Sequence, residues 1–182
     1  MARIVLLNGV GSAGKSSLAR ALQKITAEPF LHVAMDAFID MLPEHLQDDP
    51  ATFRFEPLQM DGQPAIAIQT GAAGERLMQG MRRAITGLAD AGNHLIIDDV
   101  MLGDESADYQ RLLGRHELHT VGVFASLPVL EAREKARGDR LIGLARWQFD
   151  RVHRDRHYDL ELSTDDLSPA AAAQLVKARF AL

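Results

Sequence analysis

A glycine-rich loop between an apolar run and a helical pattern is the feature that most constrains this fold. The run Ile4–Leu7 is unbroken and apolar, as in a strand that is buried on both faces of a parallel sheet. A helical pattern begins at Lys15. Between the two, Gly9, Gly14, Lys15 and Ser16 satisfy the spacing Gly, four residues, Gly, Lys, then Ser or Thr. The chain therefore begins with a strand, a phosphate-binding loop and a helix.

The residue types in this loop suit nucleotide phosphates. Glycines let several backbone amides face one phosphate, and the dipole of the following helix adds positive potential. Lys15 is expected to reach the β and γ phosphates of ATP, and the Ser16 hydroxyl to ligate Mg²⁺. We expect Lys15→Ala to abolish phosphate transfer and to leave the stability of the free protein almost unchanged. The predicted nucleotide contacts are Gly9, Val10, Gly11, Ser12, Ala13, Gly14, Lys15, Ser16 and Ser17.

Further β-type runs alternate with helical patterns, which predicts an α/β fold with a five-stranded, mostly parallel sheet between two layers of helices. Pro50–Thr70 fits neither pattern, and Asp61 with Gly62 suggests a turn, so this stretch is interpreted as a small insertion. Ser168 is expected to cap a last helix that starts with Pro169. The predicted strands are Ile4–Leu7, Phe30–Ala34, Leu95–Ile97, Thr120–Ala125 and, as an edge strand, Tyr158–Leu162.

Length and composition describe an ordinary globular domain. The 182 residues are 47% hydrophobic and 25% charged, which fits one domain over residues 1–182. The absence of cysteine excludes a disulfide scaffold, a thiol nucleophile and a thiolate metal site. A net charge of -5 argues against nucleic acid and anionic membranes as partners. We expect a cytoplasmic protein, and the sequence leaves the oligomeric state open, a homo-oligomer included.

Acidic residues follow two of the predicted strands. In an open parallel sheet, residues just past the strands converge on one crevice. Asp98 and Asp99 follow Leu95–Ile97, where a protein with this loop places the acid that holds Mg²⁺. Because side chains alternate along a strand, only one of the two should face the loop, and Asp98 is preferred. Asp36 follows Phe30–Ala34 and could accept a proton from an attacking hydroxyl, or cap a helix that starts at Ala37.

An arginine-rich segment lies between residues 131 and 157. Its basic residues outnumber its acids by eight to five in an otherwise acidic chain. Arg133, Arg137 and Arg140 fall at i, i+4 and i+7, so a helix that continued past Gly138 would align them. Such a row can close over transferring phosphates as a lid, which we place at residues 131–149. The alternative is a solvated helix with internal pairs such as Glu134 with Arg137.

Two other groups of residues carry weaker signals. His153 and His157 stand four apart, but no third ligand is spaced to join them, so we interpret both as surface histidines. In the insertion, Phe53, Phe55 and Met60 either line an acceptor pocket or only pack the insertion itself.

Five segments, spread in order over nearly the whole chain, together resemble the chloramphenicol phosphotransferase-like family. The resemblance implies a P-loop kinase fold related to shikimate and adenylylsulfate kinases, with transfer of the ATP γ phosphate to a hydroxyl. It also implies that Asp36 is the base and that Arg133–Arg140 supplies the lid arginines. The family loop often has serines where this chain has Val10 and Gly11. The matching segments are Gly9–Ser17, Val33–Pro43, Asp98–Val100, Arg133–Arg140, and Tyr158 and Asp159 with Glu161 and Thr164.

The sequence therefore predicts an ATP- and Mg²⁺-dependent small-molecule kinase, with chloramphenicol as one candidate acceptor. A kinase for a sugar, another metabolite or a nucleotide sugar is the alternative of the same class. A nucleotide-dependent switch is the alternative of another class. It is disfavoured because the Asn-Lys-x-Asp motif that reads guanine is absent, and Asp99 with Gly103 is one residue too long for Asp-x-x-Gly.

Overall fold

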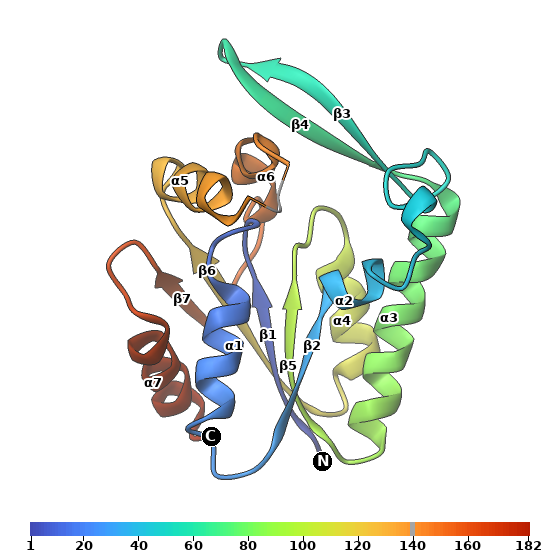
Figure 1. Ribbon diagram of the computed structural model, residues 1–182. Helices are drawn as coiled ribbons and strands as arrows, with labels where there is room; N and C mark the ends of the chain where they lie inside the picture. The colour runs from blue at the N-terminus through green and yellow to red at the C-terminus, as the bar shows by residue number, and fades with distance from the viewer. Residues whose placement is uncertain (139–140) are drawn as a thin grey trace.

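Five parallel strands form the centre of the molecule (Figure 1). The computed structural model describes residues 1–138 and 141–182. Asn8, the last residue of the central strand, pairs with Asp99, the last residue of one neighbouring strand, and with Gly122, two residues before the end of the other. The predicted α/β class with its parallel sheet is confirmed. In spatial order the strands are β2 (Phe30–Ala34), β5 (His94–Asp99), β1 (Arg3–Asn8), β6 (Glu117–Phe124) and β7 (Leu160–Ser163).

Alternation along β1 divides the core between the two faces of the sheet. Val5 and Leu7 pack in a cluster with residues of the helices α1 (Lys15–Gln23) and α7 (Pro169–Phe180). Ile4 and Leu6 point the other way, into a cluster with residues of α3 (Ala72–Asp90) and α4 (Glu105–Leu113). Because both faces are buried, the strand has to be apolar throughout, which is why its sequence shows a continuous run.

Most predicted elements are present, with shifted ends. β2 has the predicted bounds, whereas the edge strand β7 begins at Leu160 rather than Tyr158. The short helix α2 (Met35–Ile39) begins two residues before Ala37, the expected start. The Ser168 hydroxyl accepts a hydrogen bond of 3.2 Å from the Ala171 amide, so the predicted cap of α7 is confirmed.

The predicted insertion is a β-hairpin that projects beyond the carboxyl end of the sheet (Figure 1). Its strands are β3 (Phe53–Met60) and β4 (Gln63–Thr70), and a short 3₁₀ turn (Glu44–Leu46) precedes it. Asp61 and Gly62 both adopt positive φ, at 51° and 73°, as a two-residue hairpin turn requires. The predicted turn is therefore confirmed.

Two helices lie between the hairpin and the phosphate loop. α5 (Leu127–Arg137) ends because Gly138 adopts a left-handed conformation, with φ 71°. The continuous helix that would have aligned Arg133, Arg137 and Arg140 therefore stops at Arg137, and Arg140 lies outside the described residues. α6 (Leu144–Val152) follows, and the buried Glu134 carboxylate accepts hydrogen bonds of 2.8 Å from the amides of Gly143 and Ala145 at its start. Glu134 therefore anchors the start of α6.

No helix in residues 1–138 and 141–182 is both long enough and apolar enough to cross a bilayer.

Candidate active site

The phosphate loop runs from the end of β1 to the start of α1. Gly9 is required there, because a Cβ at this position would lie 2.3 Å from the carbonyl oxygen of Val123 on β6. Gly14 has φ 92°, a conformation that side chains disfavour. Val10 and Ala13 pack their side chains into the core below the loop, which leaves only their backbone for a ligand. An apolar residue thus fits position 10, where the family often has serine.

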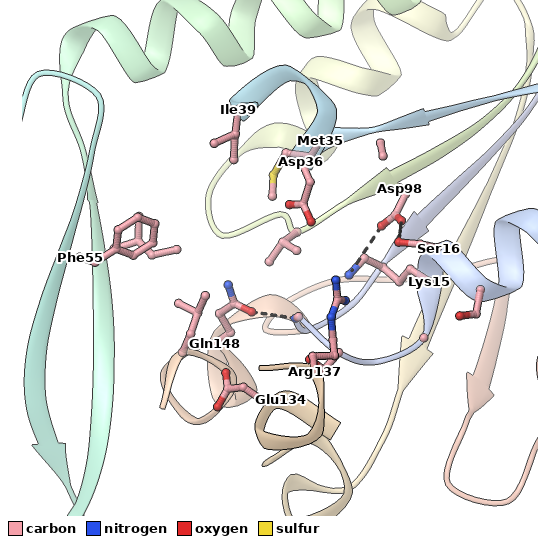
Figure 2. A pocket seen from close by; sticks show the side chains of 18 residues that line it. Lys15, Ser16, Met35, Asp36, Ile39, Phe55, Asp98, Glu134, Arg137 and Gln148 are labelled. Carbon is pink, nitrogen blue, oxygen red and sulfur yellow. Dashed lines mark hydrogen bonds and ion pairs between the residues drawn. The ribbon is translucent and has the colours of Figure 1, made fainter. Parts of the chain in front are cut away.

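Three adjoining cavities follow the carboxyl edge of the sheet. The loop cavity lies in the middle and contains Lys15, Ser16, Asp36 and Asp98 (Figure 2). The α7 cavity lies on one side, between the loop, α5 and the start of α7. The hairpin cavity lies on the other side, between α2, α3, the residues that follow β5 and the hairpin. Six of the predicted nucleotide contacts line the loop cavity, namely Gly11, Ser12, Gly14, Lys15, Ser16 and Ser17.

Lys15 and Asp98 face each other at the floor of the loop cavity. Lys15 is only 6% exposed, and its Nζ donates hydrogen bonds to the carbonyls of Gly9 at 2.9 Å and Val10 at 3.1 Å. Asp98 Oδ1 lies 3.7 Å from the same nitrogen. The Ser16 hydroxyl donates to Asp98 Oδ2 at 2.6 Å. Lys15 therefore ties the two ends of the loop together through its own hydrogen bonds, so we expect its loss to lower the stability of the free protein more than the sequence predicted.

Asp98 remains ionised in this setting. Burial favours the neutral acid, but the charge of Lys15, the neighbouring His32 ring and the hydrogen bond from Ser16 outweigh it, so the pKa of Asp98 is lowered. His32 Nε2 lies 3.5 Å from Asp98 Oδ2, at the limit of a hydrogen bond. Ser16 and Asp98 thus offer hard oxygen ligands beside the loop, as Mg²⁺ prefers.

Asp99 points away from the loop. Its carboxylate accepts a hydrogen bond of 2.7 Å from the Tyr109 hydroxyl and another of 2.7 Å from the Val100 amide. Burial raises the pKa of Asp99, and the Tyr109 hydrogen bond only partly opposes that effect. Of the two candidate acids, Asp98 alone contacts residues of the phosphate loop in the described structure.

The donor set fits a Mg²⁺ ion that is shared with phosphate. No cluster of three or more His, Asp or Glu residues able to hold a metal ion occurs in the described residues. Ser16 and Asp98 supply only part of a six-oxygen shell, so phosphate oxygens and water would have to complete it.

Asp36 lies in the first turn of α2, and its carboxylate points into the loop cavity (Figure 2). The alternative that it caps a helix starting at Ala37 is wrong, because the residue before the helix is Ala34 and no side chain caps this end. Asp36 is half-buried and lies on the same side of the cavity as Met35 and Ile39. A hydroxyl that entered from the hairpin side would meet this carboxylate near the loop.

Arg133 and Arg137, the two described arginines of the predicted lid, occupy different positions. Arg133 donates to the Thr164 hydroxyl at 2.9 Å and to its carbonyl at 2.7 Å, and the Thr164 hydroxyl in turn donates to the Ala13 carbonyl at 2.9 Å. Arg133 therefore lines the α7 cavity and ties α5 to the segment before α7. Arg137 is exposed and lines both the α7 cavity and the loop cavity. Arg137 is thus the described arginine at the loop cavity.

The hairpin cavity has one mainly apolar wall and a volume of about 600 Å³, within the usual range for small-molecule pockets. Phe53 and Phe55 line it, and Phe55 also lines the loop cavity. Met60 lies near the hairpin turn and is not among the residues that line either cavity. Of the three apolar residues that the sequence singled out, the two phenylalanines face a pocket.

Two residues in α6 and just after it differ from expectation or were missed. His153 is half-buried and stacks on Phe124 with ring centroids 3.8 Å apart, so its assignment to the surface is wrong, whereas His157 is exposed as expected. Gln148 is only 3% exposed, and its Oε1 accepts a hydrogen bond of 2.8 Å from the Gly11 amide of the phosphate loop. A glutamine in a mixed helical pattern belongs to no motif, so no sequence signal could have revealed this contact.

Comparison with known proteins agrees with the geometry. The family model described as chloramphenicol phosphotransferase-like protein matches residues 2–181. The chain belongs to this family. A Mycobacterium tuberculosis protein from strain H37Rv, named as a candidate O-phosphotransferase, is 36% identical over 169 residues, which cover 89% of this chain and 75% of the relative.

Solved structures extend the likeness of this chloramphenicol phosphotransferase-like protein at the level of fold. The adenylylsulfate (APS) kinase of M. tuberculosis superposes with a TM-score of 0.68 at 18% identity, covering 100% of this chain and 98% of that one. The shikimate kinase of Acinetobacter baumannii gives 0.61 at 12% identity, covering 100% and 94%. A gluconokinase of Sinorhizobium meliloti 1021 gives 0.61 at 18% identity, covering 99% and 91%. The P-loop kinase fold is therefore established.

Proposed function

We propose that this protein transfers the γ phosphate of ATP to a hydroxyl group of a small molecule. The observation that carries the proposal is that Lys15, Ser16, Asp36 and Asp98 line one cavity, which adjoins a larger cavity with one apolar wall. A phosphate-binding loop alone would suit a switch as well as a kinase. A carboxylate between the loop and a second pocket suits a kinase, because an acceptor hydroxyl needs such a group to take its proton.

The nucleotide would span two of the cavities. Its phosphates would lie in the loop cavity, over the amides that begin α1, where the helix dipole favours negative charge. Its base would lie in the α7 cavity, where Leu18, Leu167 and Ala172 offer apolar contacts beside Arg133. Ser16 and Asp98 would hold Mg²⁺, which when bound neutralises charge on the phosphates.

The acceptor would enter from the hairpin cavity. Its hydroxyl would be oriented by Asp36, which takes the proton as the hydroxyl oxygen bonds to the γ phosphorus. The bond between that phosphorus and the bridging oxygen breaks, and ADP leaves with the electron pair. Lys15 and Arg137 would stabilise negative charge on the transferring group. The products are ADP and a phosphate monoester of the acceptor.

The apolar boundary between the two cavities and the name of the family both bear on which acceptor is proposed. Met35, Ile39, Phe55 and Ile68 form an apolar boundary between the loop cavity and the hairpin cavity, which suits a hydroxyl carried on an apolar or aromatic body. Chloramphenicol fits that description and gives the family its name, so its primary hydroxyl is the first acceptor to test. Sugars, metabolites and nucleotide sugars are the alternatives.

The test is incubation of the protein with ATP, Mg²⁺ and a panel of hydroxyl compounds that includes chloramphenicol, followed by phosphorus NMR. We expect ADP and one new phosphate monoester resonance that grows with an acceptor of the right shape. Release of inorganic phosphate alone with every compound would leave the acceptor unidentified. Tight guanine-nucleotide binding without transfer to any compound would favour the nucleotide switch.

A further inference from the structure

We propose that Gln148 binds the transferring phosphoryl group through its Nε2 amide while its Oε1 holds the Gly11 amide of the phosphate loop. This inference rests on the proposed phosphotransferase function. It adds a neutral hydrogen-bond donor to the charged groups that the sequence identified.

The position of Gln148 between two cavities is the first argument. Six described residues line both the loop cavity and the hairpin cavity, and five of them are apolar. Gln148 is the one polar side chain among the six. Because the acceptor hydroxyl must cross this boundary to meet the phosphoryl group in the loop cavity, the polar group there lies beside the site of transfer. The five apolar residues are Met35, Ile39, Phe55, Ile68 and Val100.

The orientation of the carboxamide is the second argument. Its Oε1 accepts from the Gly11 amide at 2.8 Å, which fixes which end of the group faces the loop. The Nε2 end then points away from Gly11, toward the side of the cavity that carries Met35 and Asp36 (Figure 2). A Cβ at Gly11 would approach Oε1 to 3.2 Å, so glycine at this position leaves room for the contact. Nε2 therefore presents its hydrogens where phosphate oxygens would arrive.

The rigidity of α6 is the third argument. The Glu134 carboxylate holds its first turn through the Gly143 and Ala145 amides, each at 2.8 Å. At its other end, the buried Asn8 side chain donates to the Val152 carbonyl at 2.9 Å. The hairpin also contacts the start of α6, because the Ile66 amide donates to the Gly143 carbonyl at 3.1 Å. A donor on a helix fixed at both ends is held in place before substrate binds, which transition-state stabilisation requires.

Gln148→Glu separates the two halves of this role. A glutamate can still accept from the Gly11 amide with one oxygen, but its second oxygen repels phosphate instead of donating to it. We expect affinity for ATP to fall at least tenfold relative to affinity for ADP, and phosphate transfer to fall roughly 10²-fold. Gln174→Glu makes the same charge change at an exposed site on α7 and should alter neither quantity.

Gln148→Leu tests for a merely structural role. If Gln148 only supports the loop, this variant should weaken ATP and ADP binding equally and lower the melting temperature, and Gln148→Glu should keep the wild-type ATP-to-ADP ratio. If Gln148→Glu has the same ratio of ATP affinity to ADP affinity as the wild type, the proposal is overturned. The ratio needs no acceptor, so it can be measured by calorimetry even when the acceptor is unknown. A wild-type protein that bound neither nucleotide would instead overturn the proposed function.

Discussion

At the residue scale, the carboxylates of the site differ in what surrounds them. Asp98 is held ionised by Lys15 and the Ser16 hydroxyl, whereas Asp99, one residue later, is buried against Tyr109. The alternation of a β-strand is enough to separate them, because consecutive side chains point to opposite faces. Asp36 lines the same cavity as Asp98, on a short helix that follows a different strand. One edge of the sheet thus carries three aspartates in three different settings.

Asp36→Asn should abolish most phosphate transfer while leaving ATP affinity and melting temperature near wild type. Asparagine keeps the size of the side chain but cannot take a proton from the acceptor. Transfer should fall by roughly 10² to 10⁴, and toward the lower figure if the transition state is loose. Asp40→Asn, at the exposed end of the same helix, is the matched control and should transfer normally. Steady-state kinetics with saturating acceptor measure the effect, and near-normal turnover in Asp36→Asn would remove Asp36 from the mechanism.

His153 should make the folded protein less stable in mild acid. Burial, followed by the charges of Lys15 and Arg156, lowers the pKa of His153 from 6.5 to about 4. The unfolded chain therefore binds a proton between these values that the folded protein does not, so stability falls as pH drops from about 6.5 toward 4. Urea denaturation at pH 7.5 and pH 5 measures the loss.

His153→Phe is the control for this pH dependence. Phenylalanine can stack on Phe124 as the imidazole does, but it does not titrate. The Tyr158 hydroxyl, which hydrogen-bonds to His153 in the wild type, would lose this contact at every pH. The stability of the variant is therefore compared with itself at the two pH values. We expect it to lose less stability than wild type on acidification. An equal loss in the two proteins would assign the acid sensitivity to other groups.

At the element scale, the sequence predicted what local patterns determine and missed what contacts decide. The five strands and the hairpin turn at Asp61 and Gly62 follow from periodicity and from residues that tolerate positive φ. The alignment of Arg133, Arg137 and Arg140 depended on a helix that continued past Gly138, and Gly138 ends that helix. His153 and Gln148 were missed because their partners, Phe124 and Gly11, are 29 and 137 residues away, and no local pattern encodes such pairs.

We expect the two described arginines of α5 to have different roles. Arg137 lines the loop cavity, so Arg137→Ala should lower turnover by roughly tenfold or more with a smaller change in ATP affinity. Arg133 is bound to Thr164, so Arg133→Ala should mainly destabilise the fold, by about 1–2 kcal/mol. Arg154→Ala, at an exposed position, is the control for loss of charge. Equal turnover in Arg137→Ala and Arg154→Ala would contradict a lid role for Arg137.

At the scale of the whole molecule, the site is built where separate elements meet at the carboxyl edge of one sheet. The loop after β1, the helix after β2, the acid at the end of β5 and the helices after β6 all reach the loop cavity. The sequence could place residues at strand ends, but the order of the strands decides which ends are neighbours. A ligand in this groove contacts many elements together, so binding should be visible in the stability of the entire domain.

ATP with Mg²⁺ should therefore raise the melting temperature, and Lys15 should be needed for the effect. At a free ATP concentration of 100 times Kd, binding adds about 2.7 kcal/mol to the free energy of unfolding. For a domain of this length that corresponds to a rise of roughly 5–11 °C. Lys15→Met keeps much of the side-chain volume but removes the charge that faces phosphate and Asp98.

The melting temperatures measured without nucleotide and with ATP and Mg²⁺ distinguish the two roles of Lys15. Without nucleotide, Lys15→Met should melt below wild type, because Lys15 donates to the Gly9 and Val10 carbonyls and its charge lies near buried Asp98. With ATP and Mg²⁺, the variant should gain little of the rise that wild type shows. Lys24→Met, at the exposed end of α1, should match wild type in both conditions. If ATP and Mg²⁺ raised the melting temperature of Lys15→Met as much as that of wild type, ATP would bind outside the loop cavity. That result would contradict the proposed positions of nucleotide and acceptor along the groove.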